Sequence, residues 1–393
     1  MSVRQWRGKW WSDNIDQFGT RHRHSFATKR EAVAHDMEMR SAISSGSYRP
    51  DAAKTKVADI AAAFIKDCEE RVAIGELRRT TADNYIGHTR RYILGELDMG
   101  ASTRPDLKGA FFKHPLGNMR LMDVDNDVLE RFRRTLLMQG LSQGTVRLVL
   151  VTLNRVFRLA KGRRLIGHNP VKEYQEDRGK YGKAIEGKTE VSIPERETVQ
   201  RLISVASPYG RLAIMFAALT GLRSGEQRAL PWRNVDLDKR VVRVERTIDR
   251  YGSFKVPKTK AGVREVPIPP VLAEALRDHL ATTAWPGPDD LVFGNAKGKP
   301  VYHGTLNKGV YARAWASLLA TEEGARLKRV SWKSLRHFAV STWIDKNVPV
   351  KRVQRWAGHA TAQITLDTYA HLFEKEQHAS VIDEIGNEVV GLD

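Results

Sequence analysis

The segment VSWKSLRHFAVSTWIDKNVPVKRVQRWAGHATAQITLDTYAHL, residues 330–372, carries the pattern on which the interpretation of this chain depends. Lys333 and Arg336 are three residues apart, so a helix places them one turn apart on one face, where two cations can contact one phosphate. Tyr369 follows His359 by ten residues. A lone tyrosine on an amphipathic helix is usually a core residue. Because Lys333 and Arg336 precede it, Tyr369 could instead be a reactive residue, which is the alternative to a core role.

The charge balance predicts a polyanionic partner. The chain of 393 residues has 65 Lys and Arg against 46 Asp and Glu, a formal net charge of +19 and a pI near 10.0. Nucleic acid is the first candidate for such a partner. A generally basic surface, a ribosome-associated protein or a membrane-surface protein would show the same balance, so the local motifs must decide.

Hydropathy and cysteine content indicate a cytoplasmic protein. Mean hydropathy is −0.44, and no apolar run reaches the roughly 18 residues of a membrane span. The N-terminal sequence MSVRQWRGKWW lacks the apolar core of a signal peptide. The single cysteine, Cys68, cannot form an internal disulfide, which agrees with a reducing compartment.

The length predicts two or three domains. The N-terminal residues alternate apolar and polar positions around a turn at Gly19 and become helical after Thr28, which predicts a short meander followed by a helix. The next part reads as a helical bundle. Residues 44–55, rich in Ser, Gly and Pro, and the charged residues 167–190 are predicted linkers. The predicted domains are residues 1–50, 55–170 and 190–393.

Basic residues of the first two predicted domains are candidates for DNA contacts. The N-terminal strands mix aromatic residues with cations, as a sheet inserted into a DNA groove does, although part of the aromatic set must pack on the helix. Cations on the helices suit phosphates, and a solvated helix face explains any one of them equally well. The candidates are Arg7, Lys9, Arg21 and Arg23 in the N-terminal module, and Arg90, Arg91, Arg147, Arg163 and Arg164 in the helical domain.

Five short motifs follow one another between residues 220 and 370. They are Thr220-Gly-Leu-Arg223 with Glu226; a hairpin predicted in FKVPKTKAGVREVPIPP, residues 254–270, with Lys260 or its rival Lys258 near the tip; Lys333-Ser-Leu-Arg336-His337; Trp356-Ala-Gly-His359; and Tyr369. In this order they resemble the tyrosine recombinase, or phage integrase, family, of the lambda-integrase type with an arm-binding N-terminal domain.

The resemblance implies a multidomain α+β fold. Its parts are a small β-sheet-plus-helix N-terminal module, a helical SAM-like core-binding domain, and a mainly α catalytic domain with a small antiparallel sheet. It also implies a homotetramer on double-stranded DNA with core and arm attachment sites, aided by a host DNA-bending protein and a directionality factor. We therefore expect a site-specific recombinase that integrates and excises phage or mobile-element DNA in the cytoplasm of a prokaryotic host cell.

The resemblance also implies catalytic roles. Arg223, supported by Glu226, and Arg336 hold the scissile phosphate, and guanidinium groups suit this because they are planar donors that stay charged. Tyr369 is the nucleophile, and Lys260 donates a proton to the leaving 5′ oxygen. Attack leaves a 3′-phosphotyrosyl link that keeps the bond energy. We therefore expect neither ATP, another cofactor nor a metal.

The chain departs from the family at Lys333, where histidine is usual. A lysine keeps a cationic donor for the phosphate but is a poor base near neutral pH unless it is strongly desolvated. Removal of the Tyr369 proton therefore stays open between Lys333 and His359. His337 is expected to be a supporting residue.

Two other functions share these features. A type IB topoisomerase uses the same tyrosine and arginine chemistry but relaxes supercoils as a monomer, and a DNA-binding relative that has lost catalysis would explain Lys333. The loop at residues 294–300 lacks the spacing of a phosphate-binding P-loop, and no compact carboxylate cluster suggests a two-metal nuclease. The acidic tail, residues 378–393, is expected to pack on its own domain or on a neighbouring protomer.

Overall fold

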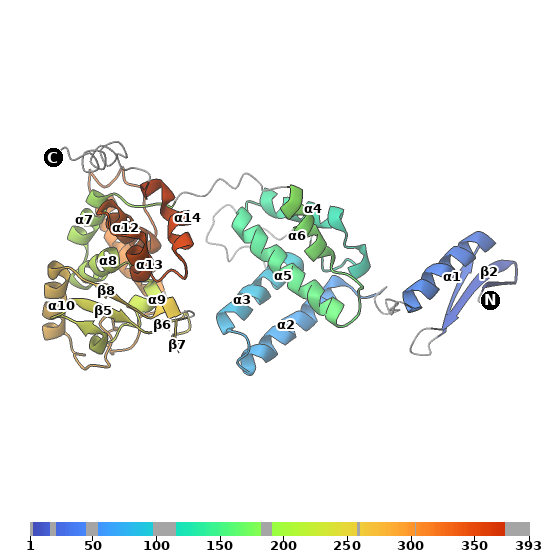
Figure 1. The fold of residues 1–393 in the computed structure, drawn as a ribbon, viewed down its shortest axis with the longest axis horizontal. Coiled ribbons are helices and arrows are strands. Elements are labelled where there is room, and N and C mark those ends of the chain that lie inside the picture. Colours follow the sequence, from blue (N-terminus) through green and yellow to red (C-terminus); the bar gives the residue numbers. More distant parts are fainter. Residues whose placement is uncertain are drawn as a thin grey trace, which may run out of the picture. The chain divides into compact units, whose positions relative to one another are not determined.

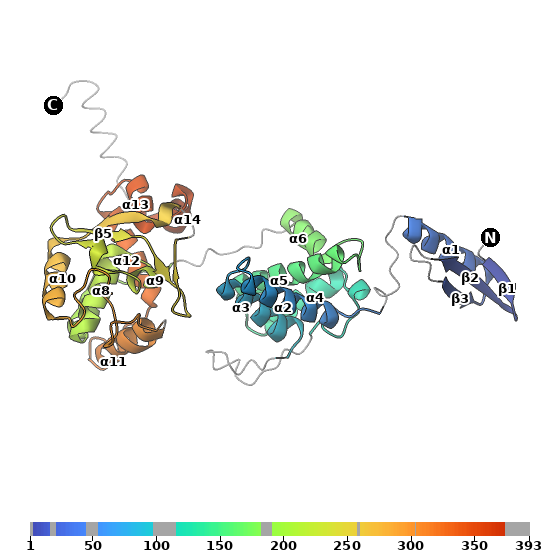
Figure 2. The same cartoon turned by 90° about the horizontal axis from the view of Figure 1, so that it is seen from below.

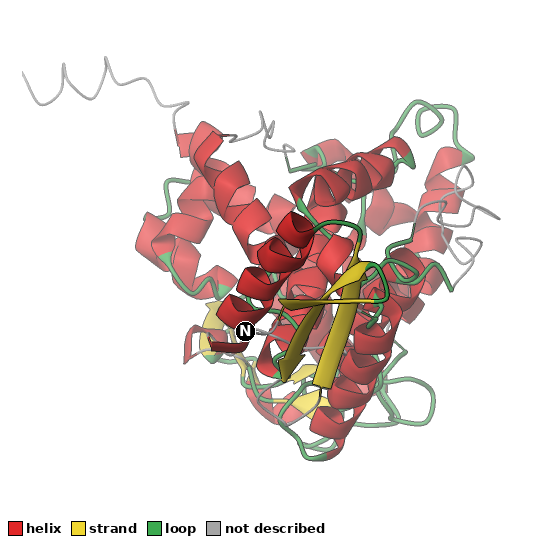
Figure 3. Cartoon of the chain, turned by 90° about the vertical axis from the view of Figure 1, so that its right-hand side faces the viewer, coloured by secondary structure: helices red, strands yellow, loops and turns green. Residues whose placement is uncertain are grey.

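The computed structural model describes residues 3–15, 21–44, 54–96, 115–181, 191–257, 260–302 and 304–373. The chain divides into two compact units, Met1–Glu186 and Gly187–Asp393, and each is described by itself. Helices predominate over strands (Figure 3). In the ranges given above, no helix is both long and apolar enough to cross a membrane.

The chain begins with a three-stranded antiparallel sheet and one helix. Strands β1 (Val3–Trp6), β2 (Lys9–Ile15) and β3 (Arg21–Phe26) lie in that order, and α1 (Lys29–Ser44) packs along the sheet (Figure 2). Alternate residues of β2 point to opposite faces, so Ser12 is buried while Asp13 lies on the other side. The predicted meander and helix are confirmed, and the predicted turn residue Gly19 lies outside the described residues.

The middle of the chain is helical, as predicted (Figure 1). Its elements are α2 (Val57–Ala73), α3 (Arg79–His88), the π-helical segment η1 (Thr89–Ile93), the 3-10 turn η4 (Leu121–Asp123), α4 (Asn126–Met138), α5 (Gln143–Gly162) and α6 (Pro170–Tyr181). The side chains of Asp125 and Ser142 cap α4 and α5 by accepting backbone N–H groups at 2.8 and 3.2 Å. Helix α5 packs against α2, α4 and α6.

The prediction of a linker over residues 167–190 is wrong where α6 forms. Asn169 begins this helix by accepting two backbone N–H groups through its side-chain oxygen, at 3.1 and 3.2 Å. Tyr174 is buried and donates to Glu130 of α4 at 2.5 Å. Apart from Val171 and Tyr174, the residues of α6 that follow Pro170 are mostly polar and charged. The segment therefore lacks the apolar periodicity that predicts a helix.

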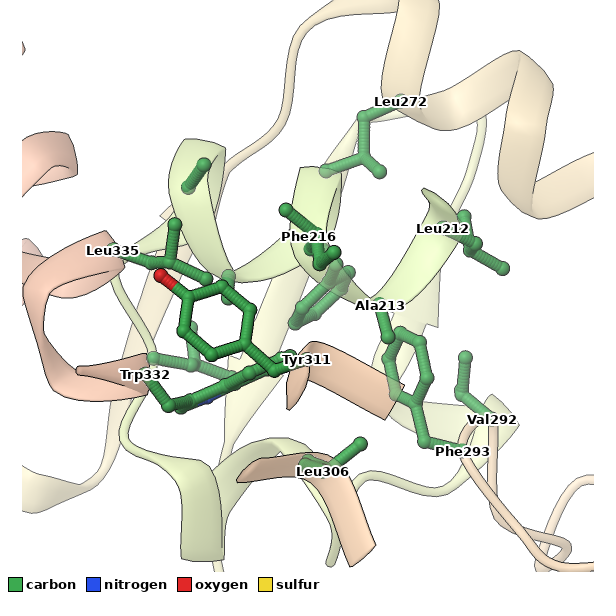
Figure 4. Packing of buried hydrophobic residues seen from close by; sticks show 14 of the residues in the cluster. Leu212, Ala213, Phe216, Leu272, Val292, Phe293, Leu306, Tyr311, Trp332 and Leu335 are labelled. Carbon is green, nitrogen blue, oxygen red and sulfur yellow. The ribbon is translucent and has the colours of Figure 1, made fainter. Parts of the chain in front are cut away.

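The second unit is built mainly from helices around a main hydrophobic core, with a smaller cluster that includes Val340 and Tyr369. The helical elements are α7 (Arg196–Val205), α8 (Pro208–Thr220), α9 (Ser224–Gln227), η5 (Trp232–Asn234), η6 (Lys260–Gly262), α10 (Pro270–Thr282), η7 (Thr305–Tyr311), α11 (Ala312–Leu319), α12 (Trp332–Asp345), α13 (Val350–Ala357) and α14 (Ala362–Phe373). Figure 4 shows Phe216 of α8, Phe293 and Tyr311 among the buried side chains. Helix α8 contacts α7, α10 and α12, and this places the end of α8 beside α12.

The strands of this unit pair differently from the prediction. They are β4 (Val235–Asp236), β5 (Val241–Val244), β6 (Thr247–Ile248), β7 (Phe254–Lys255) and β8 (Arg264–Pro267). The predicted hairpin of β7 with β8 is wrong, because β7 pairs with β6 and β8 pairs with β5. Val242 and Val266 face each other across β5 and β8, and both are fully buried. Their packing in the core specifies this pairing.

Candidate active site

The ends of two helices bring the candidate residues together. Helix α8 ends at Gly221, which has a left-handed backbone (φ 60°), and Arg223 starts α9 two residues later. Helix α13 ends in the same way at Gly358 (φ 65°), directly before His359. Helix α12, which carries Arg336, packs against α8, α13 and α14. Two tight turns and one central helix therefore assemble motifs that lie more than 100 residues apart.

Arg336 joins the two helix ends. Its side chain donates from Nη1 to the Gly221 carbonyl at 2.7 Å and from Nη2 to the Ala357 carbonyl at 2.5 Å. The last carbonyls of a helix carry partial negative charge and need partners. The residue is only 8% exposed, and burial together with the charge of Arg223 lowers its pKa to about 9. Arg336 therefore stays charged at neutral pH and keeps three further N–H donors for a ligand.

Glu226 holds two arginines in place. Its carboxylate accepts from Nη1 of Arg223 at 2.8 Å and forms two hydrogen bonds with Arg264, at 2.8 and 3.1 Å. Nη2 of Arg223 also donates to the Gly358 carbonyl at 3.0 Å. Burial raises the pKa of Glu226, but the hydrogen bond and the charge of Arg264, with the charge of Arg223, outweigh it and hold the pKa at about 2. The supporting role expected for Glu226 thus has a definite geometry.

Arg264 is a residue that the sequence interpretation missed. It lies in β8, is 4% exposed, and donates from Nε to the Trp356 carbonyl at 2.7 Å and from Nη1 to the Gly262 carbonyl at 3.2 Å. It therefore connects Glu226, the end of η6 and α13. The signal was present in the sequence, because Arg264 occupies the same side of an alternating strand as the buried Val266.

Tyr369 is a buried residue whose hydroxyl has a polar contact. Its ring packs with Val340, Val353 and Ala357, and the residue is 1% exposed. Its hydroxyl lies 2.6 Å from Nδ1 of His337. The backbone of α14 is non-helical at Tyr369 (φ −127°, ψ 16°). Burial raises the pKa of Tyr369 to about 12, although the charge of Arg336 acts in the opposite direction.

The remaining predicted catalytic residues are His359, Lys333 and Lys260, of which His359 and Lys333 differ in burial. His359 Nδ1 is 2.9 Å from the hydroxyl of Thr365, and burial, followed by the charges of Arg336 and Arg223, lowers the His359 pKa to about 4. Lys333 is exposed on α12. Lys260 begins η6, but its side chain, like the whole of Lys258, lies outside the described residues.

The centre of the site has an excess of positive charge. Arg223, Arg264 and Arg336 carry three positive charges against the single carboxylate of Glu226, so these four residues sum to +2. Such a centre suits an anion such as a phosphodiester. Within the described ranges, no three His, Cys, Asp or Glu residues lie close enough together to hold a metal ion.

The N-terminal candidates are exposed: Arg21 and Arg23 lie on β3, Lys9 begins β2, and Arg7 lies in the turn between β1 and β2. Asp13 bonds Arg21 at 2.6 Å and both Arg4 and Arg23 at 3.3 Å. The hydrogen bond from Arg21 and the three positive charges lower the pKa of Asp13 to about 2. The remaining candidates of this module are Arg7, which lies over the Trp6 ring at 4.7 Å, and the exposed Lys9.

The candidates of the helical part differ in exposure. Arg90 and Arg91 lie in the π-helical segment η1, where Arg90 is exposed and Arg91 is half-buried. Three further candidates are exposed: Arg147 on α5, and Arg163 and Arg164 directly after the end of α5. Arg155, which was not predicted, lies over the Tyr85 ring at 4.8 Å.

Comparison with known proteins agrees with the motif order. Residues 195–376 match the phage integrase family. A XerC-like tyrosine recombinase of Caldanaerobacter subterraneus is 24% identical over 320 residues, which cover 76% of this chain and 75% of that protein. An integrase of Streptomyces ambofaciens is 25% identical over 334 residues, which cover 81% of each.

Two solved structures share the fold. The Tn1549 transposon integrase in complex with a circular intermediate DNA has a TM-score of 0.64 at 18% identity, covering 84% of this chain and 99% of that one. A lambda integrase dimer bound to a core site has a TM-score of 0.55 at 16% identity, covering 93% and 94%. The family match and the relatives agree, and residues 195–376 of this chain belong to the phage integrase family of tyrosine recombinases.

Proposed function

We propose that this chain cleaves and rejoins double-stranded DNA at phage or mobile-element attachment sites through a 3′-phosphotyrosyl intermediate. Its family makes it a site-specific recombinase acting on DNA. The observation that carries the proposed chemistry is the pair of Arg223 and Arg336. Their guanidinium groups bond the neighbouring carbonyls of Gly358 and Ala357, so the two cations lie side by side.

Two adjacent guanidinium groups suit the transition state of phosphodiester cleavage. Negative charge builds on the non-bridging oxygens during in-line attack, and fixed donors stabilise it without reorganisation. Arg336 is fixed by two carbonyls, and Arg223 by one carbonyl and Glu226. Both keep unused N–H groups. We assign these two residues to the scissile phosphate and assign Glu226 and Arg264 to holding them in position.

Tyr369 is the proposed nucleophile. The charge of Arg336 acts on its hydroxyl and favours the phenolate, while His337 contacts the same oxygen. Lys260, with Lys258 as the alternative, is proposed to protonate the leaving 5′ oxygen. Lys333 is proposed to contribute positive charge near the phosphate, and His359, whose lowered pKa keeps its ring neutral, is proposed to donate a hydrogen bond to it. The phosphotyrosyl link keeps the energy of the broken bond, so rejoining needs no ATP.

The proposed partners are DNA and further copies of this chain. Relatives of the same fold include a lambda integrase dimer on a core site and a lambda integrase tetramer on a Holliday junction. We propose that this chain also works as a tetramer, with the N-terminal sheet on arm sites and the helical part on core sites. A host bending protein, a directionality factor and docking of the tail on a neighbouring protomer belong to this proposal. Residues 378–393 lie outside the described residues.

A two-plasmid assay tests the proposal. One plasmid carries the DNA flanking the gene on the element side, and the other carries the rejoined chromosomal target. If the chain is a recombinase, wild type should join the two plasmids at a specific sequence, and Tyr369→Phe should give no joint product. A type IB topoisomerase would instead relax both supercoiled plasmids without joining them. A DNA-binding relative that has lost catalysis would bind both plasmids and change neither.

A further inference from the structure

We infer that His337 is the general base that removes the proton from Tyr369 during attack. The sequence left this step open between Lys333 and His359. The inference rests on the proposed function, because it requires Tyr369 to be the nucleophile. It adds a catalytic role for a side chain that the sequence interpretation considered only a supporting residue.

The contact between the two residues is direct. Nδ1 of His337 lies 2.6 Å from the Tyr369 hydroxyl, and the two ring centroids are 5.9 Å apart. A base within about 2.6–3.2 Å of the proton donor meets the geometric requirement for general base catalysis. Arg336 is the neighbour of His337 on α12, and its charge acts on Tyr369. The same helix therefore supplies the phosphate ligand and the contact to the nucleophile.

The two earlier candidates lack this contact. Among the described residues, His337 is the only side chain hydrogen-bonded to the Tyr369 hydroxyl. His359 directs Nδ1 to the hydroxyl of Thr365 at 2.9 Å. Lys333 is exposed, and a protonated ammonium group has no lone pair with which to accept a proton. Geometry therefore favours His337 over both.

The charges around His337 connect its basicity to DNA binding. Burial, followed by the charges of Lys333 and Arg336, lowers the pKa of His337 to about 4, so the ring is neutral at pH 7 and Nδ1 can accept from the tyrosine. A bound phosphodiester places a negative charge beside these cations and offsets their effect. The proton affinity of His337 then rises only when substrate is present, which keeps the hydroxyl protonated in the free enzyme.

The proton transfers balance in both directions. The Tyr369 proton moves to Nδ1 of His337 while the phenolate oxygen bonds to phosphorus and the bond to the 5′ oxygen breaks. The 5′ oxygen takes a proton from the proposed acid, Lys260. In rejoining, the 5′ hydroxyl returns its proton to Lys260 and attacks phosphorus. The departing Tyr369 oxygen then recovers its proton from His337.

Two variants separate proton removal from simple positioning. In His337→Asn, the amide oxygen can take the place of Nδ1 and accept the tyrosine hydrogen bond, but it is not a base. His337→Ala loses both properties. The assay is single-turnover formation of the covalent adduct on nicked suicide duplexes that tile the DNA flanking the gene, with DNA affinity and tryptophan fluorescence checking binding and folding. We expect both variants to lose about 10²–10⁴-fold in cleavage rate at unchanged affinity. Wild-type rates in His337→Asn would overturn the inference.

A sulfur leaving group locates the defect. A 5′-bridging phosphorothiolate leaves without protonation, so it should restore cleavage to Lys260→Ala and leave the His337→Asn defect unchanged. Replacement of Tyr369 by the more acidic 3-fluorotyrosine should instead shrink the His337→Asn defect several-fold. Restored cleavage of the phosphorothiolate substrate by His337→Asn would refute the assignment of His337 as the base. Faster cleavage by His337→Asn than by wild type would also refute it. If wild type itself forms no adduct on any duplex, the proposed function fails, and this result is distinct from failure of the His337 role.

Discussion

Glu226→Gln is expected to destabilise the second unit by about 3 kcal/mol. The ionised carboxylate has its pKa lowered from 4.5 to about 2, which corresponds to about 3 kcal/mol at neutral pH. Removal of one partner from a buried ion pair costs roughly 3–5 kcal/mol by independent measurements in other proteins, because the second charge is left without a partner. Arg264, 4% exposed, is the side chain left in that position.

The effect should depend on pH with a definite sign. Because the folded pKa of Glu226 is lowered, its contribution is fully present above about pH 4.5 and is lost as the pH falls towards about 2. Glu226→Gln should therefore unfold about 3 kcal/mol more easily than wild type at pH 7, and the difference should shrink steadily below pH 4.5. For a unit of this size, the difference at pH 7 lowers the melting temperature by roughly 6–12 °C.

The assay is thermal and urea unfolding of the full chain, followed by tryptophan fluorescence. Six of the nine tryptophans lie after residue 231, and the other three are in the N-terminal module. Glu274→Gln is the matched control, because Glu274 is exposed on α10 and should change stability by no more than about 0.5 kcal/mol. A Glu226→Gln effect below about 1 kcal/mol, or one that is the same at pH 3 and pH 7, would refute the reasoning.

Three further substitutions test other parts of the account. Gly358→Ala should lower the free energy of unfolding by roughly 2–3 kcal/mol, because φ is +65° and a Cβ atom would lie 2.8 Å from the Arg264 guanidinium. The control Gly252→Ala, with φ +83° and no atom within 4 Å of the added Cβ, should lower it by only about 1–2 kcal/mol in the same urea unfolding. Equal losses of stability in the two variants would contradict the contact with Arg264. Arg336→Lys should slow adduct formation about 10²–10³-fold at unchanged DNA affinity, since one ammonium cannot replace the planar donors; near-normal rates would contradict its role. Asp13→Asn should release a neighbouring arginine such as Arg21 for a DNA phosphate. The slope of log DNA affinity against log salt concentration, measured by fluorescence anisotropy, should then steepen by about 0.9. An unchanged slope would exclude this face of the sheet from phosphate contact.

Local patterns allowed much of the fold to be predicted. The helices of the middle part other than α6 follow from their apolar periodicity, and the cap at Ser142 was predictable from its position before α5. The spacing of Arg223 and Glu226 also has a local meaning, since the carboxylate three residues later accepts the Arg223 backbone N–H at 2.9 Å. Interactions within one helical turn are therefore visible in the sequence.

Contacts between distant segments were not visible in the same way. Glu226 and Arg264 are 38 residues apart, and His337 and Tyr369 are 32 residues apart, so no local spacing indicates either contact. The pairing of β8 with β5 rather than β7 depends on which valines reach the core. The motif order grouped Arg223, Arg336 and Tyr369 in one part of the chain, and they lie in one unit, but only the structure shows that His337 contacts the Tyr369 hydroxyl.

The central claim is that Tyr369 attacks DNA and becomes covalently joined to it. The most direct measurement mixes wild type and Tyr369→Phe with nicked suicide duplexes that tile the DNA flanking the gene, and then separates denatured products by size. The account predicts a protein–DNA adduct with wild type alone, and a phosphotyrosine at residue 369 in the digested adduct. Full occupancy of a recombination-competent duplex without an adduct, or an adduct that persists in Tyr369→Phe, would contradict it.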